Sequence, residues 1–450
     1  MEEAFMKMAL SGLLFLCAGV VMAGTPLNIS FQKYTLANGL SVILHEDHSV
    51  PIVAVNVWYH VGSSREKLGR TGFAHLFEHM MFQGSDHVEK GGHFGKIQDA
   101  GGTLNGSTTN DRTNYFETVP SQFLELALWL ESDRMGYLLP AMNQAKLDNQ
   151  RDVVKNERRQ SYENQPYGRA DEMLSAMMYD AAHPYNWPVI GSMADLGAAS
   201  LDDVKEFFSF YYAPNNASMC IAGDFNPLQA KEWVAKYFSS IPRGKDVAPI
   251  KEEQPSTTTA KRDVMEDRVQ LPRLYAAWHT TPLFGKDDAL LDIVADVLAG
   301  GKNSRLYKAL VYDKQIAQEV SAYQYSRERA GAFYIEITAK PGISLSEIEK
   351  AMREEIAGIQ KNGVSDREVQ RARNGIRSQF IFRLQSVAGK ADQLNSYNVM
   401  RGDPGVMNKD LSRYDGITAE QVQRAAKRYL TPEAVVLSIV PTGKKELGAQ

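Results

Sequence analysis

The first half of the chain opens with short apolar stretches that are typical of β-strands. Residues 40–46 (LSVILHE) and 52–61 (IVAVNVWYHV) carry β-branched and aromatic side chains at close spacing. Residues 121–138 instead place apolar side chains three and four positions apart, which is the spacing of one helix face. Strands and helices therefore both occur within one half of the chain, and we expect an α+β fold.

The pattern breaks down between about residues 241 and 262. The segment IPRGKDVAPIKEEQPSTTTAKR is rich in Pro, Lys, Thr and Glu and has no periodic spacing of apolar residues. We interpret residues 243–261 as a linker between two domains. An N-terminal half (26–242) and a C-terminal half (262–445) follow, and two large domains suit a length of 450 residues.

The two halves resemble each other when the chain is shifted so that Ser200 falls on Thr418. In both, an N-capped helix is followed by Tyr, then Pro, then a strand-like stretch. This order predicts a duplicated fold, with two homologous halves that each consist of a mainly antiparallel sheet packed with helices. The same shift places Val204, Tyr211, Pro214 and Ile221 on Val422, Tyr429, Pro432 and Ile439.

The N-terminus has the features of a secretory signal. Lys7 precedes an apolar run, Met8–Val21, and small residues lead up to Ala23. The alternative, a membrane anchor, needs about 20 apolar residues, more than this run has. Residues 1–23 are therefore predicted to be a signal peptide, cleaved after Ala23. We expect an exported protein, most simply periplasmic, with no membrane span in the mature chain. The acidic Glu2 and Glu3 are unusual here, so translation could also start at Met6 or Met8.

Composition narrows the possible partners. The net charge is −4 and the sequence pI is about 6.2. The chain therefore has no excess of basic residues with which to bind the phosphates of a nucleic acid. Of the two cysteines, Cys17 lies in the predicted signal, so the mature chain keeps only Cys220. One cysteine cannot form an internal disulfide, and we expect a buried, unreactive thiol.

One short motif carries metal chemistry. In His75-Leu76-Phe77-Glu78-His79 the three polar side chains lie at i, i+3 and i+4, on one face of a helix. Their flanks are apolar, and a buried polar group without a partner costs about 1–3 kcal/mol. A divalent metal ion would satisfy all three side chains, whereas the alternative is a pair of hydrogen-bonded core histidines. The spelling H-x-x-E-H is the inverted zinc-protease motif.

The motif supplies two of the three protein ligands of a catalytic zinc site. His75 and His79 would bind the ion, and Glu78 is placed to act as general base toward water. Two imidazoles and a carboxylate suit zinc best, although cobalt or manganese could substitute in vitro. The spacing leaves the third ligand open between Asp152, Glu157 and Glu163.

The motif at His75–His79, followed much later by Glu157, resembles the pitrilysin or insulinase family of zinc metallopeptidases, family M16. The chain, at 50.2 kDa, looks most like the bacterial and mitochondrial-processing-peptidase-type branch of similar size. The resemblance extends over nearly the whole mature chain. It includes Gly72-Phe73-Ala74, Gly101-Gly102-Thr103-Leu104-Asn105, Asp111-Arg112-Thr113, Tyr115, Val153-Val154, Tyr212-Ala213-Pro214-Asn215, Gly223-Asp224 and Ser304-Arg305-Leu306-Tyr307.

This resemblance implies a half-shell of a clamshell peptidase with one Zn2+ per chain. It implies that Glu157 is the third ligand and Glu78 the general base. It also implies that Gly102, Thr103, Leu104 and Asn105 lead into an edge strand that binds peptide by strand addition, with Asn105 touching the peptide backbone. Without the family, Gly101-Gly102 would be interpreted as a turn. Gln150 stands where the family often has an acid, and we expect it to support the ligands by hydrogen bonding without adding charge.

The second half departs from complete members of the family. There, an Arg and a Tyr seven positions apart help to bind substrate and stabilise the oxyanion. Here Val311 and Gln318 occupy these places, and Arg305 and Tyr312 form a shifted alternative pair. The shift that aligns the two halves also puts Ile293, Val297 and Gly375 opposite His75, His79 and Glu157, so the second half lacks metal ligands.

The expected function is therefore a zinc endopeptidase that hydrolyses peptides or unfolded segments as the metal subunit of a heterodimer. A homologous partner would supply the Arg/Tyr pair. A homodimeric peptidase and a non-catalytic structural subunit are the alternatives. His87 and His93 lie in a glycine-rich stretch after the motif and are predicted to belong to a surface loop. No residue indicates a cleavage preference.

Overall fold

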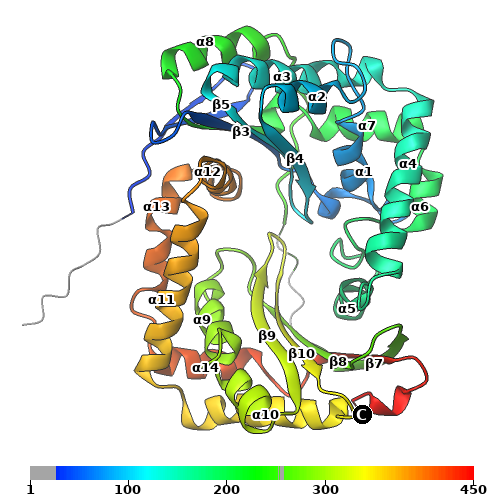
Figure 1. Cartoon of the computed structure of the whole chain (residues 1–450), viewed down its shortest axis with the longest axis vertical. Coiled ribbons are helices and arrows are strands. Elements are labelled where there is room, and N and C mark those ends of the chain that lie inside the picture. Colours follow the sequence, from blue (N-terminus) through cyan, green and yellow to red (C-terminus); the bar gives the residue numbers. More distant parts are fainter. Residues whose placement is uncertain (1–26, 252, 254–257, 450) are drawn as a thin grey trace, which may run out of the picture.

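The computed structural model describes residues 27–251, 253 and 258–449, so the predicted signal peptide lies outside the described residues. The described chain forms two sheet-and-helix halves that face each other (Figure 1). The first half occupies the upper part of the view and the second half the lower part. Each half has its own apolar core between sheet and helices.

The first half is built on a six-stranded sheet with the order β1-β2-β6-β3-β5-β4. Strands β2 and β6 run parallel, and the other neighbours run antiparallel. The strands are β1 (Gln32–Thr35), β2 (Ser41–Glu46), β3 (Ile52–Tyr59), β4 (Thr103–Thr108), β5 (Thr113–Pro120) and β6 (Ala217–Gly223).

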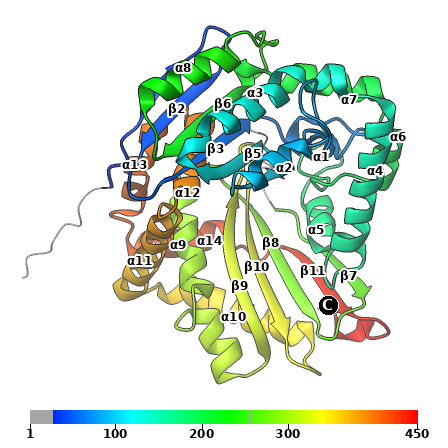
Figure 2. The same ribbon diagram turned by 45° about the horizontal axis from the view of Figure 1, so that its top comes forward.

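The second half has a five-stranded sheet with the order β7-β11-β8-β10-β9, visible face-on in Figure 2. Strands β7 and β11 are parallel and the other pairs antiparallel. The order and directions match β2-β6-β3-β5-β4 of the first sheet, and the repeat aligns the start of β11 with the start of β6. The predicted duplication is confirmed. The strands are β7 (Lys261–Asp267), β8 (Arg273–Thr280), β9 (Ala317–Ser326), β10 (Gly331–Ala339) and β11 (Val435–Pro441).

Helices cover both sheets. Those of the first half are α1 (Phe73–Met80), α2 (Gly92–Asp99), α3 (Leu124–Ala141), α4 (Gln144–Arg158), α5 (Ala170–Met178), α6 (Met193–Ala198), α7 (Leu201–Tyr211) and α8 (Pro227–Phe238). Those of the second half are α9 (Asp288–Ala299), α10 (Leu345–Asn362), α11 (Asp366–Arg383), α12 (Val387–Arg401), α13 (Met407–Asp410) and α14 (Ala419–Tyr429). Helices α7 and α14 both start with a capping box, at Ser200 and Thr418, as the repeat predicts.

Each half lends one helix to the sheet of the other half. Helix α12 of the second half packs on β3 and β6 of the first sheet, where Ala391 and Leu394 meet Ala54 and Cys220. Helix α5 of the first half packs on β8 and β11 of the second sheet. Both helices lie between the two sheets in Figure 1. The exchange buries an apolar face of each sheet and joins the halves. Cys220 is fully buried in this contact, as expected.

The segment between the halves has no regular secondary structure in its described residues. Among the described residues, none between the end of α8 at Phe238 and the start of β7 at Lys261 belongs to a helix or strand. The second sheet thus begins just before the expected boundary at 262. Within the described part of the chain, no helix combines the length and the apolar character needed to cross a membrane.

Candidate metal centre

The helix α1 carries the H-x-x-E-H motif and turns one apolar face into the first core. Phe73, Leu76, Phe77 and Met80 are buried, which leaves the face with the polar side chains directed toward α4 and β4. Gly72 precedes the helix with φ of 87°. A Cβ there would lie 2.6 Å from the carbonyl oxygen of Ile190, so close backbone approach and a left-handed conformation both require glycine.

The N-terminus of α1 is held by a residue that the sequence did not single out. The carboxyl group of Glu66 accepts hydrogen bonds from the backbone nitrogens of Gly72 (2.9 Å) and Ala74 (2.8 Å). It also accepts one from Nε1 of Trp187 at 3.1 Å. These bonds satisfy N–H groups that the first turn of a helix leaves free. Burial nevertheless raises the pKa of Glu66 to about 8. Glu66 therefore fixes the helix on which the candidate ligands stand.

Helix α4 brings Glu157 to the two histidines. Its Oε2 lies 3.2 Å from Nε2 of His79, and its Oε1 lies 3.7 Å from Nε2 of His75. One ligand atom from each of the three residues falls within 4.8 Å of the others. Asp152 and Glu163, the two alternatives that the spacing left open, are exposed and do not belong to this cluster. The geometry favours Glu157.

The charge state of the cluster suits a cation. Burial lowers the pKa of His75 to about 4, so its imidazole is neutral, the form that binds metals. The hydrogen bond with His79 holds the pKa of Glu157 below its usual range, which keeps this carboxylate ionised. The Nδ1 atom of His75 is buried without a hydrogen-bond partner among the described residues. Two imidazoles and one carboxylate form a donor set that fits zinc.

Glu78 lies beside the cluster but faces β4. Its Oε2 accepts a hydrogen bond of 2.6 Å from Oγ1 of Thr108. Gly106 passes directly over it, and a Cβ at Gly106 would come within 3.1 Å of Cγ of Glu78. Burial raises the pKa of Glu78 above its usual range, which makes the carboxylate a better proton acceptor.

The predicted substrate residues lead into β4 at the edge of the first sheet. In the sheet, β4 pairs with β5 alone. Gly102 precedes the strand, Leu104 packs against the core, and Thr103 and Asn105 are exposed. The free edge of β4 can therefore accept another strand.

Gln150 lies on α4, buried, two turns before Glu157. Its Nε2 donates to Oδ1 of Asn149 at 2.9 Å. Among the described residues, its side chain forms no hydrogen bond with His75, His79 or Glu157. The expected support for the candidate ligands is therefore not seen.

The second half offers a different surface at the positions of the expected Arg/Tyr pair. Val311 packs partly buried against the second core, and Gln318 is an exposed residue of the edge strand β9, next to a register shift. Neither side chain is a cationic or phenolic donor.

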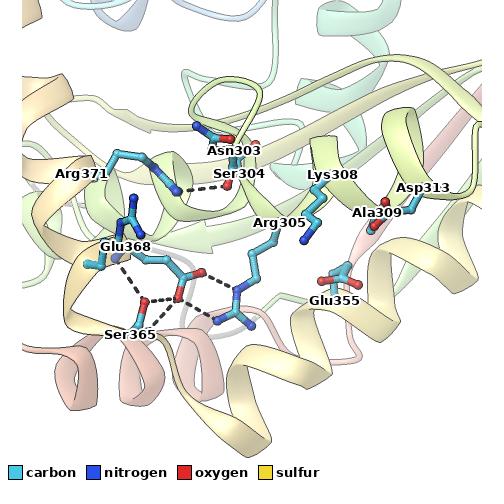
Figure 3. Close-up of a pocket in the computed structure, with 11 residues that line it drawn as sticks. Asn303, Ser304, Arg305, Lys308, Ala309, Asp313, Glu355, Ser365, Glu368 and Arg371 are labelled. Atoms are coloured by element: carbon cyan, nitrogen blue, oxygen red, sulfur yellow. Dashed lines mark hydrogen bonds and ion pairs between the residues drawn. The ribbon is translucent and has the colours of Figure 1, made fainter.

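The shifted alternative pair is engaged elsewhere. Arg305 lines an open pocket of about 860 Å³ and pairs with both carboxylate oxygens of Glu368, at 2.7 and 3.0 Å (Figure 3). It also donates to the carbonyl oxygen of Gly363, just past the end of α10. Tyr312 is 72% exposed. Arg305 thus ties α11 to the end of α10.

The positions opposite the candidate metal ligands carry no side chain that could bind a metal ion. Ile293 and Val297 are fully buried on α9, and Gly375 lies on α11. His93, expected in a surface loop, is instead 4% exposed on α2, because the glycine-rich stretch folds as a helix with His93 and Ile97 on its inner side. His87 is largely exposed and pairs with Asp133 at 2.5 Å.

Comparison with known proteins agrees with this architecture. Residues 41–187 match the family described as "Insulinase (Peptidase family M16)", and residues 198–376 match "Peptidase M16 inactive domain". Zinc protease PqqE of Helicobacter pylori is 27% identical over 442 residues, which cover 96% of this chain and 98% of that protein. A probable mitochondrial-processing peptidase subunit beta of Arabidopsis thaliana is 23% identical over 420 residues, covering 90% of this chain and 77% of that protein.

Solved structures show the same fold. The crystal structure of a protease from Helicobacter pylori has a TM-score of 0.85 and 26% identity, and the match covers 92% of this chain and 99% of that one. A peptidase M16 inactive domain from Pseudomonas fluorescens has a TM-score of 0.82 at 22% identity, covering 92% and 98%. The matched segments together span most of both halves, and the chain belongs to peptidase family M16, the insulinase family.

Proposed function

We propose that the chain is a zinc-dependent endopeptidase that hydrolyses peptides or unfolded segments. His75, His79 and Glu157 would hold one zinc ion, and Glu78 would act as general base. The observation that carries this proposal is the convergence of these four side chains from α1 and α4 beneath the free edge of β4.

The chain's own residues suit the steps of peptide hydrolysis. The edge of β4 binds an extended peptide through backbone hydrogen bonds, so the scissile bond lies over Glu78. Glu78, held by Thr108, accepts a proton from the attacking water and returns it to the leaving amine. The zinc ion, when bound, supplies Lewis acidity for the peptide carbonyl.

We further propose that this chain is the metal-bearing subunit of a heterodimer. Val311 and Gln318 stand at the positions where an Arg and a Tyr would contact substrate, and Arg305 is engaged with Glu368. A homologous partner that carries this pair and lacks H-x-x-E-H would complete the site. A homodimer that is active alone is the alternative, and it needs donors from other residues. The apolar N-terminal run supports export, most simply to the periplasm.

Hydrolysis of a mixed quenched-peptide library by the purified, zinc-loaded chain tests the proposal, with Glu78→Gln as the blank. A slow or absent reaction with one zinc per chain, followed by strong activity after addition of the homologous partner, is the expected result. Full activity of the chain alone, lost in Glu78→Gln, would refute the heterodimer and keep the peptidase. A chain purified without chelators that binds no zinc would support a structural subunit instead.

A further inference from the structure

A second group of ionisable side chains lies buried in the first half, apart from the candidate metal centre. His93 comes from α2, Glu117 from β5, and Glu131 and Arg134 from α3. They are 4%, 1%, 0% and 2% exposed, respectively. One atom each from His93, Glu117 and Glu131 lies within 4.8 Å of the others, a spacing that could hold a metal ion.

Most of the polar atoms in this group have no ordinary partner. Nη2 of Arg134 forms an ion pair with Oε1 of Glu131, whereas its Nε and Nη1 have no acceptor among the described residues. Likewise, Nε2 of His93, both carboxylate oxygens of Glu117 and Oε2 of Glu131 have no hydrogen-bond partner among the described residues. Several buried acceptors in one place are costly unless a proton, a water molecule or a cation lies between them.

The charges decide between a proton and a metal ion. Two ionised carboxylates and one guanidinium would leave a single negative charge in the protein interior. One proton removes that charge, whereas a divalent cation would leave a positive charge next to Arg134. The guanidinium of Arg134 lies over the ring of Tyr115, 4.3 Å from its centroid.

The other titratable groups facing the cluster contribute no charge. Burial lowers the pKa of His93 and raises the pKa values of Tyr59 and Tyr115, so all three remain neutral. Burial and the neighbouring Glu131 also raise the pKa of Glu117 well above its usual range. One carboxylate oxygen of Glu117 lies within 4.8 Å of one of Glu131, and two carboxyl groups this close can form a hydrogen bond only if one of them carries a proton.

The cluster supports the strand that is proposed to bind peptide. Glu117 is the residue on β5 directly opposite Leu104 of β4. Helix α2, which carries His93, leads through Gly101-Gly102 into β4. The cluster therefore connects α2, which precedes β4 in the sequence, and β5, which pairs with β4 in the sheet, to the long helix α3.

We propose that Glu117 and Glu131 form a buried pair that shares one proton, holds no metal ion, and positions β4 for peptide binding. The protonated Glu117 donates to Glu131, and Glu131 balances the charge of Arg134. The positioning role rests on the proposed peptidase function, whereas the sharing of a proton does not.

Two substitutions in the full-length, zinc-loaded chain separate the roles of the two acids. Glu117→Gln keeps a neutral side chain that can donate to Glu131, so we expect the Tm to stay near that of the wild type. Glu131→Gln leaves the guanidinium of Arg134 without a counter-charge, and we expect a clear drop in Tm. Glu125→Gln is the matched control on α3, because Glu125 forms an exposed pair with Lys236.

Peptide kinetics in the active assembly test the positioning role. In Glu131→Gln we expect KM to rise by about tenfold while kcat changes little, since a displaced β4 weakens the binding of extended peptide. A drop in Tm without a change in KM would overturn the positioning role. If no assembly hydrolyses peptide, the proposed function fails, and the thermal and metal measurements still decide on the proton.

Metal analysis tests the exclusion of a metal ion. We expect one zinc per chain in the wild type, in Glu117→Gln and in Glu131→Gln. Two metal ions in the wild type, with one lost in Glu117→Gln, would overturn the proposal in favour of a second metal site. A Tm for Glu117→Gln as low as that for Glu131→Gln would show that Glu117 is ionised and would also overturn it.

Discussion

The backbone nitrogen of Glu328 donates a hydrogen bond of 2.9 Å to Oδ2 of Asp111. Asp111 lies in the turn between β4 and β5, and Glu328 lies in the turn between β9 and β10. The edge hairpins of the two halves thus meet at their tips. The hydroxyl of Tyr185 donates to the same carboxylate at 2.9 Å. This contact fixes the position of β4, the proposed peptide-binding strand, relative to the second half.

Replacement of Asp111 by Ala should loosen this contact. The hydroxyl of Tyr185, which is fully buried, would lose its acceptor, and a buried group left without a partner costs about 1–3 kcal/mol. We expect a lower Tm and faster hydrogen exchange in both hairpins. Asp152→Ala, at an exposed position on α4, is the control. Unchanged exchange in β4–β5 and β9–β10 would contradict the proposed role of the contact.

Replacement of Glu157 by Gln should remove most of the bound zinc. An amide is a much poorer ligand than a carboxylate, and the two histidines alone hold zinc weakly. Zinc per chain after gel filtration is the measurement, together with the fall in Tm on chelation, which should be seen only where metal is bound. Asp152→Asn and Glu163→Gln should retain one zinc. Full zinc content in Glu157→Gln would exclude Glu157 as a ligand.

Replacement of Thr108 by Val should slow catalysis without loss of metal. The substitution keeps the shape and strand preference of the side chain but removes the hydrogen bond that orients Glu78. We expect kcat to fall by about tenfold, which is less than the roughly 10²–10⁴-fold contributed by a general base, because Glu78 itself is kept. Thr35→Val, at an exposed position of β1, controls for threonine loss. An unaltered kcat would mean that Glu78 needs no support from β4.

Replacement of Glu66 by Gln should weaken the metal centre through the helix that carries it. The amide puts an NH2 group, which cannot accept, in place of one of the oxygens that bind the N–H groups of Gly72, Ala74 and Trp187. A misplaced ligand helix lowers metal affinity, so we expect zinc to bind about tenfold more weakly and the Tm of the metal-free chain to fall. Competition with a chromogenic chelator measures the affinity. Glu206→Gln, exposed on α7, should match the wild type.

The local parts of the site were predictable from the sequence, because helix periodicity alone puts His75, Glu78 and His79 on one face. The repeat also predicted the second sheet, since the shift that aligns the two helix caps aligns β6 with β11 as well. Glu157 required the family resemblance, as spacing left three acids on an equal footing. Glu66 and Thr108 contact the site only through the folded arrangement of a turn and of β4, and no short-range sequence pattern predicts such contacts.

Burial of polar side chains was the property that was hardest to predict from the sequence. Three glycines around His93 are typical of a loop, yet the stretch is helical and places His93 inside. The sequence around Glu117, Glu131 and Arg134 contains no pattern that sets them apart from ordinary polar positions of a strand and a helix. Each is buried because the others lie opposite it, and such mutual dependence is visible only once β5, α2 and α3 are packed together.

The exchange of α5 and α12 has a consequence for how the protein behaves when its chain is cut or divided. Neither repeat can cover both faces of its own sheet, because the helix on one of the two faces comes from the other repeat. A chain nicked by a protease within residues 243–251 would stay associated under native conditions, with the linker no longer needed to hold the repeats together. Expressed singly, each repeat would expose an apolar sheet face and favour aggregation or the capture of a second copy. The two repeats therefore form an interlocked pair whose stability depends on both.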